Sequence, residues 1–435
     1  MFGVARRLLT RLARSVFARV IARVIFGLAR RALAWRRAPS LPSPPRTFRL
    51  SSANHRPWLE PGLLSAGWAP AEAPSEPTFV WELRKSVLPK PGGARVFNSL
   101  PNLMHLDDKA VLGLLSRGFT RTRPLATHVL YGEWDDERIG ALQRRWAEPG
   151  CAEPHWWIVK DAHSSNGFSA ALLDRRARPL RKKDVAGGYC YVVQEYVDAP
   201  LLLDGRKFEL RQYVLLRGDG SAFTYERALM RFASVEYDLH SSDRRAHITN
   251  KWVQTGWEAA NELCGLDEIE RVSTRWPAYE ALLTERITPL LCDLVDAVGP
   301  LLRSGLRAVP ASASAHHFEL FACDLVVRAS GEPVLMEVNI NPAFGTFTDA
   351  TVAELMRPLW ADLLALCVLP AAGAAPRAGG FRRLRPPWAE APPPAADDAS
   401  SAELRDHFMY CAFKKSHRKR YERKVGGDRP LLLSG

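Results

Sequence analysis

Short apolar runs separated by Gly, Asp and Arg dominate the chain from residue 156 onward. These runs are rich in Val, Leu, Tyr and Trp, which is typical of buried strands. The pattern predicts strands at residues 156–159, 189–196, 208–216 and 223–231. Two further apolar runs, at residues 318–327 and 333–340, form a hairpin pattern around a short polar loop.

Helical spacing of apolar residues marks three other segments. Asp107 and Asp108 provide an acidic start before apolar positions in residues 111–115, which predicts a capped amphipathic helix. A longer apolar stripe covers residues 279–298 and is expected to be kinked or interrupted at Pro289. A last helix is predicted around residues 355–364, and order-rich sequence is expected to end near residue 370.

The chain therefore reads as an α/β (α+β) protein with several parts. At 47% hydrophobic and 9% aromatic residues it can bury a large core, which excludes disorder throughout. An Ala- and Pro-rich stretch at residues 371–400 is expected to be an extended linker with nothing to bury. The predicted parts are a leader (1–59), an N-terminal domain (60–150), a central domain (151–232), a C-terminal domain (233–370) and a linker with a basic, disordered tail (371–435).

Charge is concentrated at the start of the chain. The chain has 60 Lys and Arg and 47 Asp and Glu. Thirteen of the Arg and none of the acidic residues lie before Glu60, so residues 60–435 are formally neutral. A neutral body excludes a protein that coats nucleic acid by charge alone. The seven Cys form no CxxC pair, which argues against a zinc site or a disulfide scaffold and favours a reducing compartment. No uncharged apolar stretch is long enough to span a membrane.

The Arg-rich leader admits several interpretations. Its Arg residues alternate with Leu, Val, Ile and Phe at helical intervals, as in an organelle transit peptide. The same pattern fits a helix that lies on an anionic membrane, or a basic arm for an acidic protein partner. A solvated extension without a function is the fourth interpretation. Residues 413–421 form a second basic segment that could contact an acidic surface or be a solvated tail.

The hairpin pattern places two carboxylates opposite each other. If Arg328 faces Pro333, Asp324 lies across from Glu337, and Asn339 shares the sheet face of Glu337. Facing carboxylates are unfavourable without a cation, and two carboxylates with an amide suit Mg²⁺. The alternative is that Asp324 is a strand-edge charge and Glu337 pairs with an Arg. An odd number of loop residues would shift the register by one and break the pair.

Cationic residues elsewhere are candidates for phosphate binding. Lys160 ends a predicted strand before a loop of small polar residues that includes Gly167, although a strand-end Lys is often surface decoration. Residues 207–214 alternate so that Lys207, Glu209 and Arg211 share one face, which fits either a phosphate clamp or an ordinary half-exposed strand. Further polar candidates, each with a bland surface interpretation, are Arg231, Thr249, Asn250 and Lys251.

Several of these segments together resemble the tubulin–tyrosine ligase-like family. The segments WIVK, VQEYVDAPLLLDGRKFELRQYVL, LMRF, HITN, FELFACDLVV and LMEVNINPAF stand in that family's order over residues 95–365. The segment FNSLPNLMHLDDKAVL is similar to the family's N-terminal region. The resemblance implies an ATP-grasp fold with a smaller N-terminal domain. It further implies an ATP- and Mg²⁺-dependent ligase that joins an amino acid to a protein carboxylate.

The resemblance also implies roles for individual residues. ATP phosphates would contact Lys160, Lys207 and the loop at Gly167, and the adenine would contact backbone groups of Gln194, Glu195, Tyr196 and Val197. Mg²⁺ would be bound by Asp324, Glu337 and Asn339. The amino-acid and γ-phosphate end would be lined by Arg211, Arg231, Thr249 and Asn250, with Lys109 reaching in from the N-terminal domain.

Three positions depart from the family pattern. The phosphate loop has Gly167-Phe168-Ser169 where the family usually has a basic residue between two Gly, so a cation and a flexible position are missing. Glu209 replaces the usual Asp and lengthens the arm by one methylene. Glu195 replaces a common Lys, which a contact through the backbone would tolerate.

These features lead to one expected function with two rivals. We expect a ligase that adds Glu, Gly or Tyr to tubulin, as in polyglutamylation, through an acylphosphate, in the cytoplasm at microtubules or cilia. The first rival is a weak or inactive family member that binds acidic tubulin tails as an adapter. The second is a ligase for a non-tubulin protein, located in a mitochondrion or plastid if residues 1–40 are a transit peptide.

Overall fold

The computed structural model places the chain in two compact units. One unit comprises residues Met1–Ala29 and Asp397–Gly435, and the other comprises Arg30–Ala396. In the first unit a helix over residues 402–411 is described, and all elements below belong to the second. Most of the leader, Phe168 and the basic segment 413–421 lie outside the described residues. The structure describes residues 46–72, 75–82, 96–131, 136–164, 167, 169–185, 190–254, 269–306, 316–342, 344, 347–390 and 402–411.

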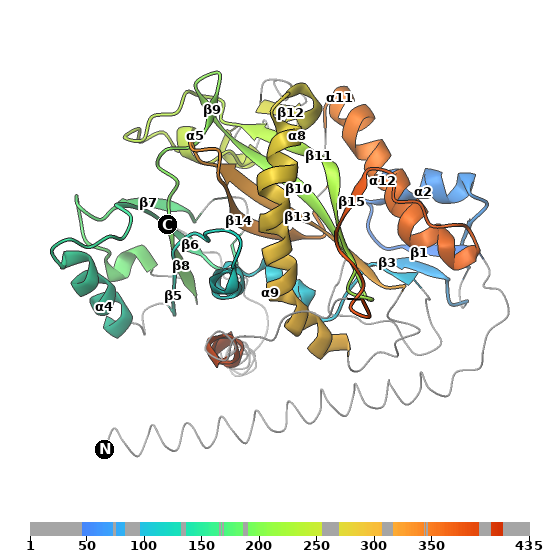
Figure 1. Ribbon diagram of the computed structural model, residues 1–435, viewed down its shortest axis with the longest axis horizontal. Coiled ribbons are helices and arrows are strands. Elements are labelled where there is room, and N and C mark those ends of the chain that lie inside the picture. Colours follow the sequence, from blue (N-terminus) through green and yellow to red (C-terminus); the bar gives the residue numbers. More distant parts are fainter. Residues whose placement is uncertain are drawn as a thin grey trace, which may run out of the picture. The chain divides into compact units, whose positions relative to one another are not determined.

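A seven-stranded antiparallel sheet forms the centre of the second unit (Figure 1). Its order is β12-β11-β10-β13-β14, with β15 paired to β11 and β9 paired to β10. The strands predicted at residues 208–216, 223–231, 318–327 and 333–340 are all present in it. Its members are β9 (Leu202–Leu203), β10 (Arg206–Arg217), β11 (Ala222–Phe232), β12 (Glu270–Val272), β13 (Phe318–Val327), β14 (Pro333–Ile340) and β15 (Phe381–Arg385).

A second sheet has the order β5-β8-β6-β7 and contains the other two predicted strands. Trp146 of α4 (Asp136–Ala147) packs on Trp157, with ring centroids 5.1 Å apart, so the helix covers one face of the sheet. β5 precedes residue 150 and β8 follows it, yet these two strands pair with each other. The sheet therefore contains residues from both sides of the predicted domain boundary at residue 150. The domain boundaries themselves stay predictions. The strands are β5 (Thr127–Leu130), β6 (Trp156–Asp161), β7 (Ala171–Asp174) and β8 (Tyr191–Glu195).

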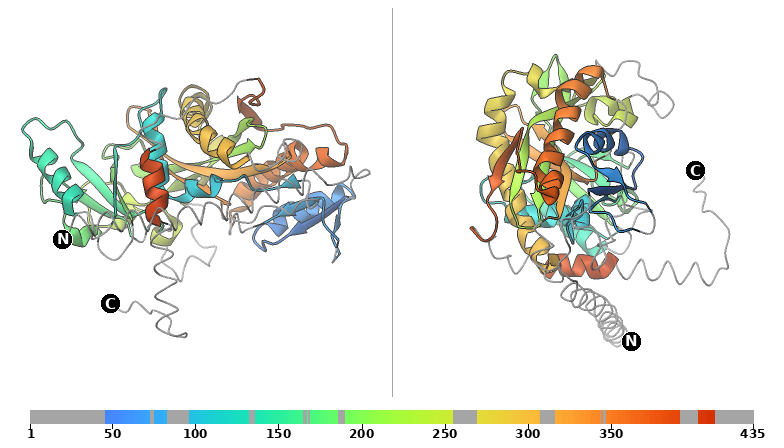
Figure 2. Two further views of the ribbon diagram at one scale, coloured as in Figure 1. Left: turned by 90° about the horizontal axis from the view of Figure 1, so that it is seen from below. Right: turned by 90° about the vertical axis from the view of Figure 1, so that its right-hand side faces the viewer.

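A third, parallel sheet is built from the first described residues in the order β2-β1-β3-β4. It carries α2 (Arg56–Ser65), which begins with a Pro in its first turn. Figures 1 and 2 show this sheet and the β5-β8-β6-β7 sheet at opposite ends of the seven-stranded sheet. The strands are β1 (Thr47–Leu50), β2 (Ala69–Pro70), β3 (Phe79–Trp81) and β4 (Val96–Phe97).

The predicted helices are present, with differences in detail. The helix α3 (Lys109–Leu115) is capped by Asp108, whose side chain accepts a hydrogen bond from the backbone N–H of Ala110. Residues 110–115 are all buried, so α3 is enclosed and the prediction of an amphipathic helix is wrong. Before Pro289, the stripe at residues 279–298 contains a π-helical stretch, Leu283–Ile287. It joins α8 (Tyr279–Leu282) to α9 (Thr288–Leu306).

The last predicted helix is continuous from residue 349 to residue 372 and contains two π-helical stretches. It comprises α11 (Asp349–Thr351), the π stretch Val352–Met356, α12 (Arg357–Leu363), the π stretch Leu364–Val368 and a 3₁₀ turn Leu369–Ala372. Remaining short elements are the α5 turn (Arg244–His247) and 3₁₀ turns at Leu103–Asp107, Ser116–Gly118, Lys182–Val185 and Ser273–Arg275. No described helix is both long and apolar enough to cross a bilayer.

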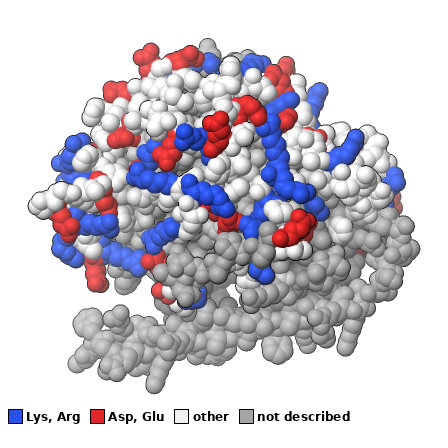
Figure 3. Space-filling model, in the orientation of Figure 1, with Lys and Arg blue, Asp and Glu red and all other residues white. Residues whose placement is uncertain are grey.

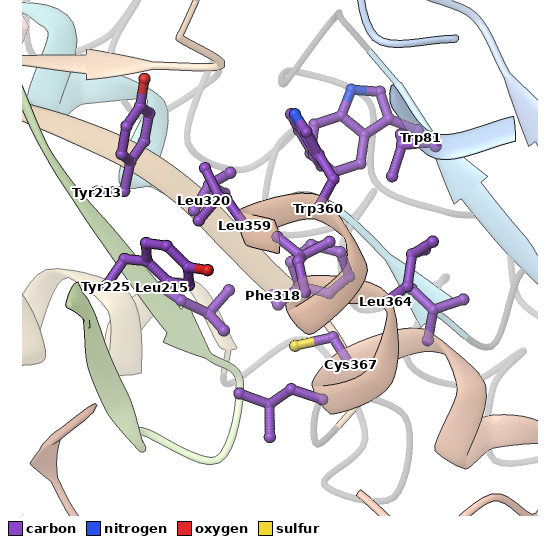
Figure 4. Packing of buried hydrophobic residues seen from close by; sticks show 14 of the residues in the cluster. Trp81, Tyr213, Leu215, Tyr225, Phe318, Leu320, Leu359, Trp360, Leu364 and Cys367 are labelled. Atoms are coloured by element: carbon purple, nitrogen blue, oxygen red, sulfur yellow. The ribbon is translucent and has the colours of Figure 1, made fainter. Parts of the chain in front are cut away.

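The two faces of the seven-stranded sheet have different coverings. On one face, Gln212 of β10 accepts a hydrogen bond of 2.6 Å from the Tyr279 hydroxyl of α8. On the other face, strand residues pack with Trp360 of α12 and with Trp81 of β3 in a large apolar core (Figure 4). This core includes Phe318, Leu320 and Ala322 of β13, which lie on one face of the strand. Asp324 is the next residue of β13 on that face. The core therefore supports the strand that carries the predicted carboxylate.

Residues 371–390 correct a prediction. The strand β15 pairs with β11, and Phe381 is 4% exposed within the same core as Trp360. The expectation that order ends near residue 370 and that this stretch has nothing to bury is wrong up to residue 390. The segment Phe381–Arg385 has only two apolar residues, three positions apart, so it carries no period-2 strand pattern in the sequence.

Candidate active site

The hairpin of β13 and β14 brings Asp324 opposite Glu337 by two compensating irregularities. At the turn Val327 faces Pro333, so the loop has the odd length that was expected to break the pair. The register shifts between Leu325 and Asp324, because Met336 is an extra residue on β14. This β-bulge restores the pairing of Asp324 with Glu337. The predicted facing pair is confirmed, although the predicted register at the turn is wrong.

Asp324 is a buried carboxylate held by two arginines from neighbouring strands. Arg211 donates to both of its oxygens, from Nε at 2.9 Å and from Nη2 at 2.8 Å, and Arg231 approaches Oδ2 at 2.7 Å. Burial alone would raise the pKa of Asp324, but these two guanidinium groups hold that pKa below its ordinary value. The side chain is 1% exposed on an inner strand, so its interpretation as a strand-edge charge is wrong.

Glu337 and Asn339 complete the predicted ligand set on the same face of the hairpin. The Asn339 amide donates to Asp324 Oδ2 at 3.0 Å and to Glu337 Oε1 at 3.4 Å, and Lys109 Nζ lies 3.5 Å from Glu337 Oε2. Rotation of the amide by half a turn would present its oxygen between the two carboxylates. Three oxygen-bearing side chains at this spacing fit Mg²⁺, which takes a few protein oxygens and keeps other positions for phosphate and water.

Two lysines enter the site from different sheets. Lys207 of β10 is 2% exposed and donates to the backbone oxygen of His247 at 2.8 Å, which excludes an ordinary half-exposed strand. Lys160 of β6 donates to Gln194 Oε1 at 3.0 Å. Burial lowers the pKa of each lysine to about 8. Both cations are therefore poorly compensated, which favours an anionic ligand between them.

A directional chain of hydrogen bonds positions Lys207. Its Nζ donates to the Tyr196 hydroxyl at 3.3 Å and lies over the Tyr196 ring, 4.6 Å from the centroid. The Tyr196 hydroxyl lies 2.9 Å from His247 Nδ1, and His247 Nε2 lies 2.8 Å from the backbone oxygen of Ser241. Because that oxygen can only accept, Nε2 carries the proton and Nδ1 accepts from Tyr196. Burial lowers the pKa of His247, which keeps this neutral tautomer.

The loop after β6 lies against the turn that contains His247. Gly167 has φ +71°, and a Cβ there would meet Ile248 at 2.9 Å, so a residue without a side chain is required. Ser169 contacts Ser164 through their hydroxyls, and Arg244 donates to the backbone oxygen of Gly167. Arg244 is thus a cation close to the loop that lacks one of its own.

One pocket gathers most of the predicted residues. Its lining includes the lysines, the carboxylates and the Gly167 loop. The lining residues that were not predicted as site residues are Ile158, Ser164, Ser169, Ala170, His247, Ile248 and Met336. Of these, Ser164 stands in the small polar loop that was singled out as a group. The lining residues are Lys109, Ile158, Lys160, Ser164, Gly167, Ser169, Ala170, Tyr196, Lys207, Glu209, Arg231, His247, Ile248, Asn250, Asp324, Met336 and Glu337.

Other predicted residues lie behind this lining or point elsewhere. Arg211 and Gln194 contact lining residues, Asp324 and Lys160 respectively, and Thr249 has a buried hydroxyl without a hydrogen-bond partner among the described residues. Glu195 points away, because its carboxylate accepts hydrogen bonds from Arg328 at 2.7 Å and from Arg123 at 3.2 Å. Neither arginine lines this pocket, so a role of Glu195 toward a ligand is restricted to its backbone.

The backbone at the predicted adenine segment is partly committed. The N–H of Glu195 donates to Ala126 at 2.8 Å, and the N–H of Tyr196 donates to Trp156 at 3.0 Å. Within the described residues, no hydrogen bond is formed by the N–H of Val197. That N–H is the donor that remains for a base edge in this segment.

The antiparallel sheet with its carboxylate hairpin and the smaller sheet that carries Lys160 together form an ATP-grasp fold. The model of the tubulin-tyrosine ligase family matches residues 128–375, which is more than half of the chain. The chain belongs to the tubulin-tyrosine ligase family, and the resemblance noted from its motifs is confirmed.

Curated relatives share about half of this chain. The probable tubulin polyglutamylase TTLL2 of Mus musculus is 29% identical over 229 residues, which cover 50% of this chain and 39% of the relative. Tubulin glycylase 3A of Drosophila melanogaster is 29% identical over 210 residues, covering 45% of this chain and 20% of the relative. Tubulin monoglycylase TTLL3 of Homo sapiens is 27% identical over 231 residues, covering 49% and 28%. The match therefore spans less than two fifths of these relatives, whose names differ in the amino acid added.

Proposed function

We propose that this chain is an ATP- and Mg²⁺-dependent ligase that joins an amino acid to a carboxylate of a protein, with acidic tails of tubulin as the acceptor. The observation that carries the proposal is the pocket in which Lys160 and Lys207 face the hairpin of Asp324 and Glu337. Family membership and the tubulin-modifying names of the relatives support the same reaction class. The names support Glu and Gly as amino acids to be tested first.

The carboxylate hairpin is suited to hold the metal. Asp324, Glu337 and Asn339 would supply the protein oxygens, and bound Mg²⁺ would neutralise phosphate charge there. In the structure, Arg211 and Arg231 already provide Asp324 with counter-charge. Metal binding would therefore change the contacts of Asp324 with these two arginines. The three side chains that would bind the metal already lie together without it.

The chain's own residues have distinct tasks in the proposed reaction. An acceptor carboxylate oxygen attacks the γ-phosphorus of ATP, ADP leaves, and an acylphosphate forms. The amino group of the second substrate then attacks the acyl carbon, phosphate leaves, and the nitrogen loses a proton. Lys160 and Lys207 hold the phosphates in place and balance their charge. Arg231 and the Thr249 hydroxyl, which has no hydrogen-bond partner in the part of the chain that the structure describes, are the candidates for orienting the amino-acid end.

Incorporation of labelled amino acids tests this function. The full chain is incubated with tubulin, Mg-ATP and labelled Glu, Gly or Tyr in separate reactions, beside a ligase of known activity. We expect label in tubulin with one amino acid and none without ATP. No incorporation with any of the three, where the reference ligase works, would refute the proposal.

A second candidate function is a nucleotide-free adapter for acidic tails. Two observations favour it: Ser169 stands in the phosphate loop near the position of a usual cation, and Asp324 is already paired with two arginines. Thermal unfolding with saturating Mg-ATP separates the candidates, because a ligand that binds only the folded state raises the midpoint. An unchanged midpoint favours the adapter.

Location at cytoplasmic microtubules or cilia is part of the proposal, and an organelle is the alternative. The N-terminus of the protein isolated from cells distinguishes them by mass spectrometry. A mature chain that begins near residue 40 would indicate import and a non-tubulin acceptor, whereas retention of the leader supports the cytoplasmic location.

A further inference from the structure

The loop between β6 and β7, residues 162–170, contains no Lys or Arg. Four of its residues line the nucleotide pocket: Ser164, Gly167, Ser169 and Ala170. Under the proposed function this phosphate loop lies beside ATP phosphates, which carry several negative charges. The positive charge near the loop comes from side chains of other elements.

Basic and acidic side chains are interspersed on the described part of the face shown in Figure 3. Residues 60–435 are also formally neutral as a whole. Because mixed charges cancel each other at a distance, a bound anion is held mainly by the cations that lie next to it. The contacts of individual cations with the phosphate loop are therefore important.

Arg244, the first residue of the α5 turn, contacts two carbonyl groups of the phosphate loop. Its guanidinium donates to the backbone oxygen of Gly167 and, at 3.4 Å, to that of Ala170. The same two loop residues are joined by a turn hydrogen bond of 3.3 Å, from the Ala170 N–H to the Gly167 oxygen. One side chain therefore holds this turn at both of its ends.

A second cation holds the start of the loop. Lys109 Nζ donates to the backbone oxygen of Ser164 at 2.7 Å, and the Lys109 N–H donates to the backbone oxygen of Ala162 at 3.2 Å. The carbonyls of Ser164, Gly167 and Ala170 are thus each bound by a cationic side chain. A carbonyl oxygen repels a phosphate, so a cation that binds this oxygen makes the loop more favourable for an anion.

Arg244 belongs to the segment that forms the pocket wall opposite the loop. His247, Ile248 and Asn250 of this segment line the pocket, whereas Arg244 itself does not. A Cβ at Gly167 would meet Ile248 at 2.9 Å, so the loop and the segment touch beside the Arg244 contact as well. A change at Arg244 can therefore alter the loop while the pocket keeps all of its lining side chains.

The neighbouring Arg245 provides an internal comparison. Both arginines are exposed and both belong to the α5 turn. The Arg245 guanidinium donates to Asp243 Oδ2 from Nε at 3.0 Å and from Nη2 at 2.7 Å. Among the described residues, Arg245 is thus committed to its own turn, and Arg244 is committed to the phosphate loop.

We propose that Arg244 is a positioning residue for nucleotide binding, which holds the phosphate loop through the carbonyls of Gly167 and Ala170. The inference rests on the proposed function, because it assigns this loop to the ATP phosphates. Arg244 acts through the loop and does not touch the reacting atoms. It supplies from α5 a cation that the loop lacks in its own sequence.

Calorimetric titration of the full chain with Mg-ATP tests the proposal. Arg244→Gln is expected to weaken binding about fivefold and to raise KM for ATP by a similar factor, with kcat changed less than about twofold. Arg244→Lys keeps the charge but not the planar fork, so it is expected to recover part of the loss. The matched control Arg245→Gln is expected to bind within about twofold of the wild type.

Hydrogen exchange of the nucleotide-free protein gives a readout that needs no ligand. Peptides that cover residues 162–170 are expected to exchange about fivefold faster in Arg244→Gln than in the wild type or in Arg245→Gln. Peptides from β10 and β13 are expected to exchange as in the wild type. Faster exchange in these strands as well would show general destabilisation and overturn the proposal.

The remaining outcomes separate this inference from the proposed function. Equal Mg-ATP affinity in Arg244→Gln and Arg245→Gln, or unchanged exchange of the loop in Arg244→Gln, would overturn the role of Arg244 and leave the proposed function in place. A wild-type chain that binds Mg-ATP but incorporates no amino acid would refute the ligase function alone. A wild-type chain that does not bind Mg-ATP would overturn both.

Discussion

Glu337 faces Asp324 because Met336 adds one residue to β14 and offsets the odd turn at its start. The bulge has a second result. In a regular strand consecutive side chains point to opposite faces, yet Met336 and Glu337 both line the nucleotide pocket. One irregularity therefore supplies the pocket with both a carboxylate and an apolar side chain. Under the proposed function, the carboxylate would bind the metal.

Replacement Glu337→Gln tests the carboxylate pair. The variant keeps the size of the side chain but removes one of two charges available to Mg²⁺, so nucleotide affinity in Mg²⁺ is expected to fall at least about tenfold. The fold is expected to remain, because Glu337 is partly exposed. Calorimetric titration with Mg-ATP measures the loss. Glu332→Gln, in the turn of the same hairpin, is the control and should bind normally.

Replacement Asp324→Asn is expected to destabilise the fold itself. It removes the common counter-charge of Arg211 and Arg231 in a buried place, which costs about 3–5 kcal/mol of unfolding free energy. Denaturant unfolding measures the change. The matched exposed pair is Asp204 with Arg271 at 3.1 Å, and Asp204→Asn should cost no more than about 1 kcal/mol. Similar costs for both variants would contradict the role given to Asp324.

Replacement Tyr196→Phe tests the chain that positions Lys207. Loss of the hydroxyl leaves Lys207 with the His247 carbonyl as its acceptor among the described residues, and His247 Nδ1 loses its donor. We expect KM for ATP to rise about tenfold with a smaller change in kcat, since the lysine is held less firmly. Tyr225→Phe removes a hydroxyl that donates a part-buried hydrogen bond to Asp362, and it controls for loss of a tyrosine hydrogen bond. Equal effects in both variants would exclude positioning.

Nucleotide binding is expected to depend on pH above 8. Lys160 and Lys207 each have a pKa lowered to about 8, and a bound polyanion favours their charged forms. Well below pH 8 both lysines are already protonated, so almost no proton is taken up on binding. Above it, affinity should fall by up to about tenfold per pH unit for each lysine, with proton uptake on binding. Calorimetry at pH 9 in buffers of different ionisation enthalpy detects this uptake, and no uptake would contradict the lowered pKa values.

Replacement Phe381→Ala tests whether residues beyond 370 belong to the fold. The side chain is buried in the core beside Tyr225, with ring centroids 5.0 Å apart, so truncation should lower the unfolding free energy by about 3–5 kcal/mol. Arg377→Ala, at an exposed position of the same segment, is the control. A neutral effect of Phe381→Ala would restore the interpretation of this stretch as a linker.

The amino-acid sequence indicated which residues form the site more accurately than it indicated the strand register and contacts that bring them together. Alternation placed Asp324, Glu337 and Asn339 on one face, because side-chain period is a local property of a strand. The bulge at Met336 was not predictable, since it depends on how β14 packs against β13. The pairing of Asp324 with Glu337 was predicted correctly because the predicted loop was one residue too short and the bulge offset that error.

Other features depend on contacts that no local pattern contains. The two arginines on Asp324 come from β10 and β11, so only the order of strands in the sheet shows that they share one carboxylate. The enclosure of α3 depends on the elements packed around it. His247 could have been found, because it stands two residues before Thr249 in a motif already singled out. The hydrogen bond between His247 and Tyr196 could not have been predicted, because the two residues are far apart in the sequence.

The pairing of Asp324 with Arg211 and Arg231 compensates this buried carboxylate before any ligand arrives. Proteins whose metal ligands repel each other when empty depend on the ion in order to fold, and chelators unfold them. Here the ion would join a framework that is already stable, so assembly and loading are separate events. If the proposed function holds, a newly made chain is expected to reach its final shape while magnesium and nucleotide are scarce, and to become competent later without refolding.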